Sequence, residues 1–141
     1  MLIQYRLFNG EGHEKWIAIQ LDNDSSVSIW IAAINIYDGM ICDFGGIETE
    51  MDKIKGTEIE PGGFYTINAC DRKNVLTGTR GTVTLRQKSG NNPNMIIRWD
   101  CPVNDSNYLG WGGKLEGLTV HVPKVEVEGA MRKVTVIFSN A

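Results

Sequence analysis

Hydrophobic and polar residues alternate with a period of two along most of the chain, a pattern typical of half-buried β-strands. In 15–22, Ile17, Ile19 and Leu21 share one face, whereas Trp16 falls on the opposite face. The same alternation predicts six further strands, at 26–37, 64–69, 82–88, 95–100, 118–122 and 133–139. A chain with this many short alternating segments is expected to be all-β.

Strong turn signals separate these segments. The chain has 16 glycines, and the breakers lie at 61–63, 78–81, 89–93 and 110–113. Only 47–59 has the pattern of a short helix, and its glycine and β-branched residues weaken that prediction. No linker or repeat divides the sequence. We therefore predict one domain, 1–141, folded as an antiparallel β-sandwich.

Composition narrows the classes of function. The chain has 141 residues, 42% of them hydrophobic, and a formal net charge of -3. That charge argues against a nucleic-acid binder, which relies on clustered Lys and Arg. No segment approaches the roughly 20 apolar residues that span a bilayer, and 1–12 lacks the apolar run of a signal peptide. We expect a soluble protein made without a signal peptide.

The cysteines and histidines give little support for catalysis. Cys42, Cys70 and Cys101 form no C-x-x-C pair, which excludes zinc fingers and thioredoxin-like motifs. We expect three reduced, buried thiols, with one disulfide as the alternative. His13 and His121 show no metal-ligand spacing. A Cys101–His121 thiol–imidazole pair lacks a third group to orient the base, so we predict no enzyme, no metal and no cofactor.

The aromatic residues are more informative. Trp16 and Trp30 fall opposite the apolar face of their strands, and Trp111 lies in a glycine-rich segment close to Tyr108. Trp99 shares its parity with apolar neighbours and is expected in the core. Exposed indole and phenol rings favour a membrane interface. The alternative is that bulges exchange the two faces and loops cover these rings.

Several charged residues suit a zwitterionic headgroup. Arg72, Arg80 and Arg98 can each pair with a phosphate through two N–H groups, and Asp71 or Asp100 can pair with an ammonium group. The alternative for each is a solvated surface charge.

Three blocks of sequence resemble the aegerolysins, a family of small β-sandwich proteins. The blocks are Gly-Phe-Tyr-Thr-Ile-Asn-Ala-Cys-Asp-Arg at 63–72, Thr-Gly-Thr-Arg-Gly at 77–81, and Trp-Asp-Cys-Pro at 99–102. With weaker matches on either side, the resemblance covers about 16–138. Three departures are Asp71, where the family usually has Gly, Arg80, where it has Glu, and Val103, where a Trp commonly follows the Cys-Pro pair. The Glu position is associated with lipid discrimination in the family, so Arg80 reverses a charge near the expected site and leaves the lipid open.

The resemblance implies a non-enzymatic protein that recognises membranes containing sphingolipid, in some members together with a sterol. Several members recruit a larger, perforin-like partner that makes the pore, and such pairs can be haemolytic or insecticidal. The family's site of action, outside the producing cell at target membranes, is carried over as an expectation.

Taken together, these features predict a lipid-binding surface with two kinds of residue. The rings expected to enter the bilayer are those of Trp16, Tyr108 and Trp111, and the expected headgroup ligands are Arg72, Arg80 and Asp100. The alternative from a different class is a β-sandwich that binds a glycan or another protein through the same aromatic residues, without lytic activity.

Overall fold

The computed structural model describes residues 13–73, 75–87 and 94–141. The features expected at 1–12 and at 89–93 lie outside the described residues. The strands are β1 (Trp16–Asp24), β2 (Ile29–Asp38), β3 (Met40–Cys42), β4 (Glu58–Ile59), β5 (Phe64–Cys70), β6 (Thr79–Arg86), β7 (Met95–Cys101), β8 (Tyr108–Gly113), β9 (Leu118–His121) and β10 (Arg132–Asn140). Among these residues, no helix has the length and apolar character needed to cross a membrane.

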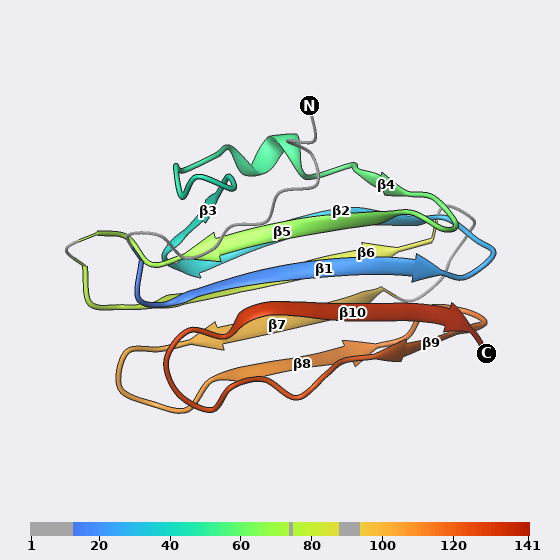
Figure 1. Ribbon diagram of the computed structural model, residues 1–141. Coiled ribbons are helices and arrows are strands. Elements are labelled where there is room, and N and C mark those ends of the chain that lie inside the picture. Colours follow the sequence, from blue (N-terminus) through green and yellow to red (C-terminus); the bar gives the residue numbers. More distant parts are fainter. Residues whose placement is uncertain (1–12, 74, 88–93) are drawn as a thin grey trace.

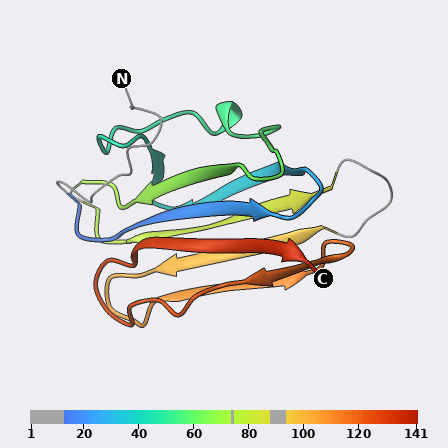
Figure 2. The same ribbon diagram turned by 45° about the vertical axis from the view of Figure 1, so that its right-hand side comes forward.

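The strands form two five-stranded sheets that pack face to face (Figure 1). Sheet A has the order β3-β5-β1-β10-β9, and sheet B has the order β4-β2-β6-β7-β8. Figure 2 shows the same two layers from a second direction. The predicted all-β sandwich is therefore confirmed.

One strand pair departs from the antiparallel arrangement that the sequence predicted. β1 and β10 run parallel at the centre of sheet A, in a register from Ile17 opposite Arg132 to Asp24 opposite Ser139. Alternation along a strand shows which side chains face the core, but it carries no information on the direction of the neighbouring strand. The first and last strands are distant in sequence, so no short turn forces them to be antiparallel.

The core lies between the sheets and is built from the alternating positions. Ile17, Ile19 and Leu21 are fully buried, as expected. Trp99 is also fully buried, and its indole N–H donates a hydrogen bond of 3.2 Å to Thr79 Oγ1. That bond satisfies the one polar group of a large core side chain.

The outer positions of β1 and β2 depart from simple alternation. Ala18 is fully buried although it lies on the outer face of β1. β2 contains two register shifts, the first between Ile31 and Ala33, and Ile34 is consequently buried in place of its odd-numbered neighbour. Val27, expected on the core face, precedes the strand and is exposed.

Two element predictions are corrected. The segment 110–113, read as a turn, belongs to strand β8, because its glycines pair along the backbone with β7 and need no side chain to do so. The segment 47–59 is not a helix. It contains a single 3₁₀ turn, Met51–Lys53, and the short strand β4, in agreement with its poor helix propensity.

A pair of strand glycines tests the packing of the core. A Cβ at Gly81 would lie 2.5 Å from the Trp99 ring and 2.5 Å from the Asn35 carbonyl oxygen. Gly81→Ala is therefore expected to lower the free energy of unfolding by about 1–3 kcal/mol through overpacking. At Gly112 a Cβ would meet nothing within 4 Å, so Gly112→Ala should stay within about 0.5 kcal/mol of wild type. Urea unfolding of the two variants measures the difference; equal stabilities would contradict this packing.

Candidate functional site

A row of charged and aromatic side chains crosses the outer face of sheet B at one end of the sandwich. Asp38 lies opposite Arg80, Arg80 opposite Asp100, and Asp100 opposite Tyr108. Residues directly opposite each other project from the same face of a sheet. We call these four residues the charged row; its carboxylates stand on either side of one guanidinium group.

Arg80 is ion-paired but keeps hydrogen-bonding capacity. Its Nε lies 3.2 Å from Asp38 Oδ2, yet Nε has no aligned hydrogen bond in the described residues. The short distance shows attraction between the charges, and the poor alignment shows that the N–H points elsewhere. The Arg80 guanidinium also lies 5.6 Å from the centre of the Tyr37 ring, within cation–π range.

A second arginine–tyrosine pair lies at the other end of the row. The Arg98 guanidinium is 5.8 Å from the centre of the Tyr108 ring. The Tyr108 hydroxyl and ring occupy the space that a Cβ at Gly110 would need, so the hydroxyl end of the ring lies over the backbone of β8. Tyr108 remains half exposed.

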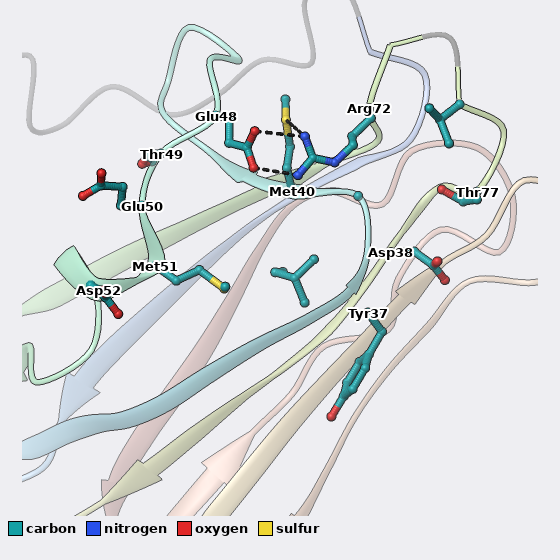
Figure 3. Close-up of a pocket in the computed structure, with 13 residues that line it drawn as sticks. Tyr37, Asp38, Met40, Glu48, Thr49, Glu50, Met51, Asp52, Arg72 and Thr77 are labelled. Carbon is teal, nitrogen blue, oxygen red and sulfur yellow. Dashed lines mark hydrogen bonds and ion pairs between the residues drawn. The ribbon is translucent and has the colours of Figure 1, made fainter.

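A groove of about 790 Å³ adjoins the charged row and shares Asp38 with it. Figure 3 shows Glu50 and Asp52 on one side of the groove and Asp38 and Thr77 on the other, with Tyr37 at its lower edge. We call this the acidic groove. Its lining residues are Ile36, Tyr37, Asp38, Gly39, Met40, Glu48, Thr49, Glu50, Met51, Asp52, Arg72, Val75 and Thr77.

One ion pair closes the upper rim of the acidic groove. Arg72 donates two hydrogen bonds to Glu48, of 2.9 and 2.6 Å, and its Nη1 also lies 3.9 Å from Met40 Sδ (Figure 3). The hydrogen bond from Arg72 holds the pKa of Glu48 below its usual range, and Glu48 in turn raises the pKa of Arg72. Asp38 and Glu48 are each paired with an arginine, so Glu50 and Asp52 give the groove its excess of negative charge, which favours a cationic group.

The structure brings most of the predicted site residues to one end of the sandwich. Arg80, Asp100 and Tyr108 share the charged row, and Arg72 lines the adjoining groove. Trp111 is half exposed on the edge strand β8, but it lies opposite the buried Ile97 and so has the parity of the core face. It is therefore not on the face that carries the row.

Trp16 lies on the outer face of β1 as predicted, but it is only partly exposed and packs against Met40, Cys42 and Cys70. Tyr37 and Asp38 were absent from the predicted site. Their only sequence signal was a tyrosine and a carboxylate at the end of an alternating strand, and pairing with β6 was needed to place them beside Arg80.

The cysteines and histidines are arranged differently from the sequence expectation. Cys101 is buried and donates a hydrogen bond of 3.3 Å to the Gly129 carbonyl, whereas His121 is exposed on β9, so the considered Cys101–His121 pair is not formed. His13, which the sequence left isolated, instead lies 2.9 Å from Asp71 Oδ1 and 3.9 Å from Cys70 Sγ. All three cysteines are free and buried, as predicted. In 13–73, 75–87 and 94–141, no group of three or more His, Cys, Asp or Glu residues is arranged to hold a metal ion.

In its described part, the chain is a ten-stranded β-sandwich with a charged row and an acidic groove at one end and no cluster suited to a metal. A family model, Aegerolysin, matches residues 14–141. The chain therefore belongs to the aegerolysin family.

Solved structures with the same fold were found by comparison. RahU, crystallised in complex with a TRIS molecule, has a TM-score of 0.78 and 16% identity, over 90% of this chain and 96% of RahU. IP-1A from Alcaligenes faecalis has a TM-score of 0.75 and 23% identity, over 99% of this chain and 97% of its own. The lipid binding protein Nakanori has a TM-score of 0.66 and 12% identity, over 92% of this chain and 73% of its own. A search of curated proteins gave no significant match.

The ion pair at the groove rim gives a pH prediction. Because Arg72 lowers the pKa of Glu48, the pair should be intact above the usual glutamate pKa and should be lost as the pH falls through the lowered value. In Arg72→Met the Glu48 carboxyl is expected to titrate at a higher pH than in wild type. NMR titration of the side-chain carboxyl carbons measures both values; an unchanged Glu48 pKa in the variant would show that the ion pair is not formed.

Proposed function

We propose that this protein binds membrane lipid through the charged row and the acidic groove. The observation that carries the proposal is the row itself, in which the Arg80 guanidinium stands between two carboxylates, with the Tyr37 ring in cation–π range and Tyr108 at the end of the row beyond Asp100. Family membership supports the proposal, as does a lipid binding protein among the structures of the same fold.

The chemistry of the row suits a zwitterionic headgroup. A phosphate can accept hydrogen bonds from the terminal N–H groups of Arg80, because this side chain is 43% exposed although its Nε is buried. The ammonium end can then enter the acidic groove, where Asp38, Glu50 and Asp52 supply negative charge. We infer a sphingolipid with a phosphorylated amino headgroup, with or without a sterol beside it. The chain's net charge of -3 argues against simple attraction to anionic lipid.

Aromatic rings beside the row supply contact with the apolar boundary. Tyr37 and Tyr108 are both more than half exposed, and phenol rings favour the interface between headgroups and acyl chains. Trp111 lies three residues further along β8 from the row, with the parity of the opposite face, and can enter the bilayer only if the edge of the sandwich tilts toward it. Trp16 is left out, because it packs on other side chains.

We further propose that lipid binding recruits a larger, perforin-like protein that forms the pore. A few rings and one headgroup site give modest affinity for a single molecule, so assembly on a membrane would add avidity. In this proposal, the two proteins together are toxic to cells, as a haemolytic or insecticidal pair, and they act outside the producing cell. In this scheme the chain acts by binding, without a catalytic step.

Vesicle sedimentation tests the lipid-binding face. Vesicles of phosphatidylcholine with and without a sphingolipid bearing phosphoethanolamine are compared. Only the vesicles that contain the sphingolipid should co-sediment with the protein. Tyr108→Ala is expected to lower that binding about 5- to 30-fold, since truncating an interface aromatic residue costs about 1–2 kcal/mol.

Phe64→Ala is the matched control. Phe64 is also an exposed aromatic residue, but it begins β5 in sheet A, at the opposite end of the sandwich (Figure 1). It should bind vesicles as wild type does. Equal losses in the two variants, or a protein that ignores every vesicle composition, would reject the proposed face.

A second candidate function is the binding of a neutral glycan, favoured by a groove on the outer face of sheet A. This groove has a volume of about 820 Å³ and is lined in part by Phe44 and Phe64. Within the described chain, Thr66 Oγ1 and Asn68 Oδ1 in its lining are buried without a hydrogen-bond partner, and such groups are rare without a ligand or water.

The two functions make opposite predictions for the same two variants. If a glycan is the ligand, Phe64→Ala should abolish retention on a glycan array, Tyr108→Ala should not, and free sugar should compete. If lipid is the ligand, neither the wild type nor either of the two variants should be retained on the glycan array.

A further inference from the structure

Two thiols lie together on the outer face of sheet A, next to the pairing of β3 with β5. Met40 lies opposite Cys70, and Cys42 lies opposite Asn68. Cys42 and Cys70 therefore project from the same face as diagonal neighbours on adjacent strands, within reach of each other's side chains. Trp16 packs against both.

A histidine and a carboxylate complete the arrangement around Cys70. His13 Nε2 lies 3.9 Å from Cys70 Sγ, and His13 Nδ1 lies 2.9 Å from Asp71 Oδ1. Asp71 also accepts a hydrogen bond of 3.2 Å from the Lys15 backbone N–H. The His13 side chain is only 2% exposed. An imidazole held between a thiol and a carboxylate can take the thiol proton, because the carboxylate stabilises the imidazolium that forms.

The second thiol is suited to the opposite role. Hydrogen bonding to Cys70 and burial both raise the pKa of Cys42, so Cys42 keeps its proton. Cys70 therefore lies against the imidazole, and Cys42 is held beside it as a proton donor.

We propose that Cys70 and Cys42 form a peroxide-reactive dithiol, in which His13 activates Cys70 and Cys42 closes a disulfide. Cys70 thiolate attacks one oxygen of hydrogen peroxide; an S–O bond forms as the O–O bond breaks, and the departing hydroxide takes the proton from His13 to become water. The Cys42 sulfur then attacks the Cys70 sulfenic acid. An S–S bond forms, the S–O bond breaks, and the thiol proton leaves with hydroxide as a second water. Two thiols are oxidised and one peroxide is reduced.

Access to the buried pair is through the edge strand. Cys70 and Cys42 are 0% and 3% exposed, and fully buried thiols are normally inert. However, β3 has only three residues and stands at the edge of sheet A, where it pairs with β5 and, on its other side, is bonded only to the short segment 47–49 in the described residues. Such a strand opens at a free energy below that of global unfolding. The same opening would admit a small oxidant to Cys70.

The third cysteine is an internal control. Cys101 is also fully buried, but its thiol donates to the Gly129 carbonyl and faces no imidazole. Burial raises the pKa of Cys101, which keeps the thiol protonated and unreactive. The proposal therefore predicts reaction at two cysteines of the three, and it is independent of the lipid-binding function.

The test is peroxide treatment of the reduced native protein, followed by denaturation, alkylation and peptide mapping. We expect the Cys42 and Cys70 peptides to appear linked by a disulfide, while Cys101 is alkylated. His13→Gln removes the proton acceptor and should slow the reaction about tenfold or more. Cys101→Ser should react at the wild-type rate.

Three results would overturn the proposal, and none needs a variant to fold. One is sulfinic acid at Cys70 with Cys42 still reduced. Another is oxidation of the Cys101 thiol as fast as oxidation of the Cys42 and Cys70 thiols. The third is a reaction rate equal to the rate of global unfolding, measured in the same buffer by urea jump, because oxidation would then be a property of the unfolded chain.

Discussion

The parallel pairing of β1 with β10 is the constraint on which sheet A depends. β1 lies between β5 and β10, and each neighbour comes from a distant part of the chain. The same pairing fixes where the chain enters the sandwich, since the Met131 N–H donates to the Trp16 carbonyl and the Asp71 N–H donates to the Lys15 carbonyl. His13 lies two residues before Lys15, so the hydrogen bond between Asp71 and Lys15 places His13 beside Asp71 and Cys70.

In sheet B, antiparallel strand pairing alone positions the polar side chains. The charged row exists because three antiparallel pairings align the ends of four strands, so that one residue from each falls in line. No loop conformation is needed to bring these side chains together. Sites built on strands are more rigid than sites built on loops, and here the rigid row is joined to an acidic groove whose walls are partly loop.

The sequence was sufficient to predict which side chains form the core, but not which strands pair or in which direction. Alternation identified Ile17, Ile19 and Leu21, because facing a core imposes a period of two on any strand. It could not reveal that β10 runs parallel to β1, or that 110–113 continues as a strand, because backbone pairing leaves little trace in side-chain type. For the site, Arg80, Asp100 and Tyr108 could be proposed individually from their chemistry. Their alignment, and the neighbouring Asp38, required the register. The partial burial of Trp16 likewise required the fold, because the side chains on β3 and β5 that pack against it are distant in sequence.

The glycine beneath Tyr108 has a consequence for how that ring meets a partner. A tyrosine on an exposed strand normally samples several rotamers, and an interface must suppress that freedom when it forms. Gly110 leaves a stretch of backbone without a side chain, over which the end of the ring already lies, and the Arg98 guanidinium is 5.8 Å from the ring centre. Much of the conformational entropy of this side chain is therefore lost on folding, and contact with a ligand surface is preorganised at smaller entropic cost.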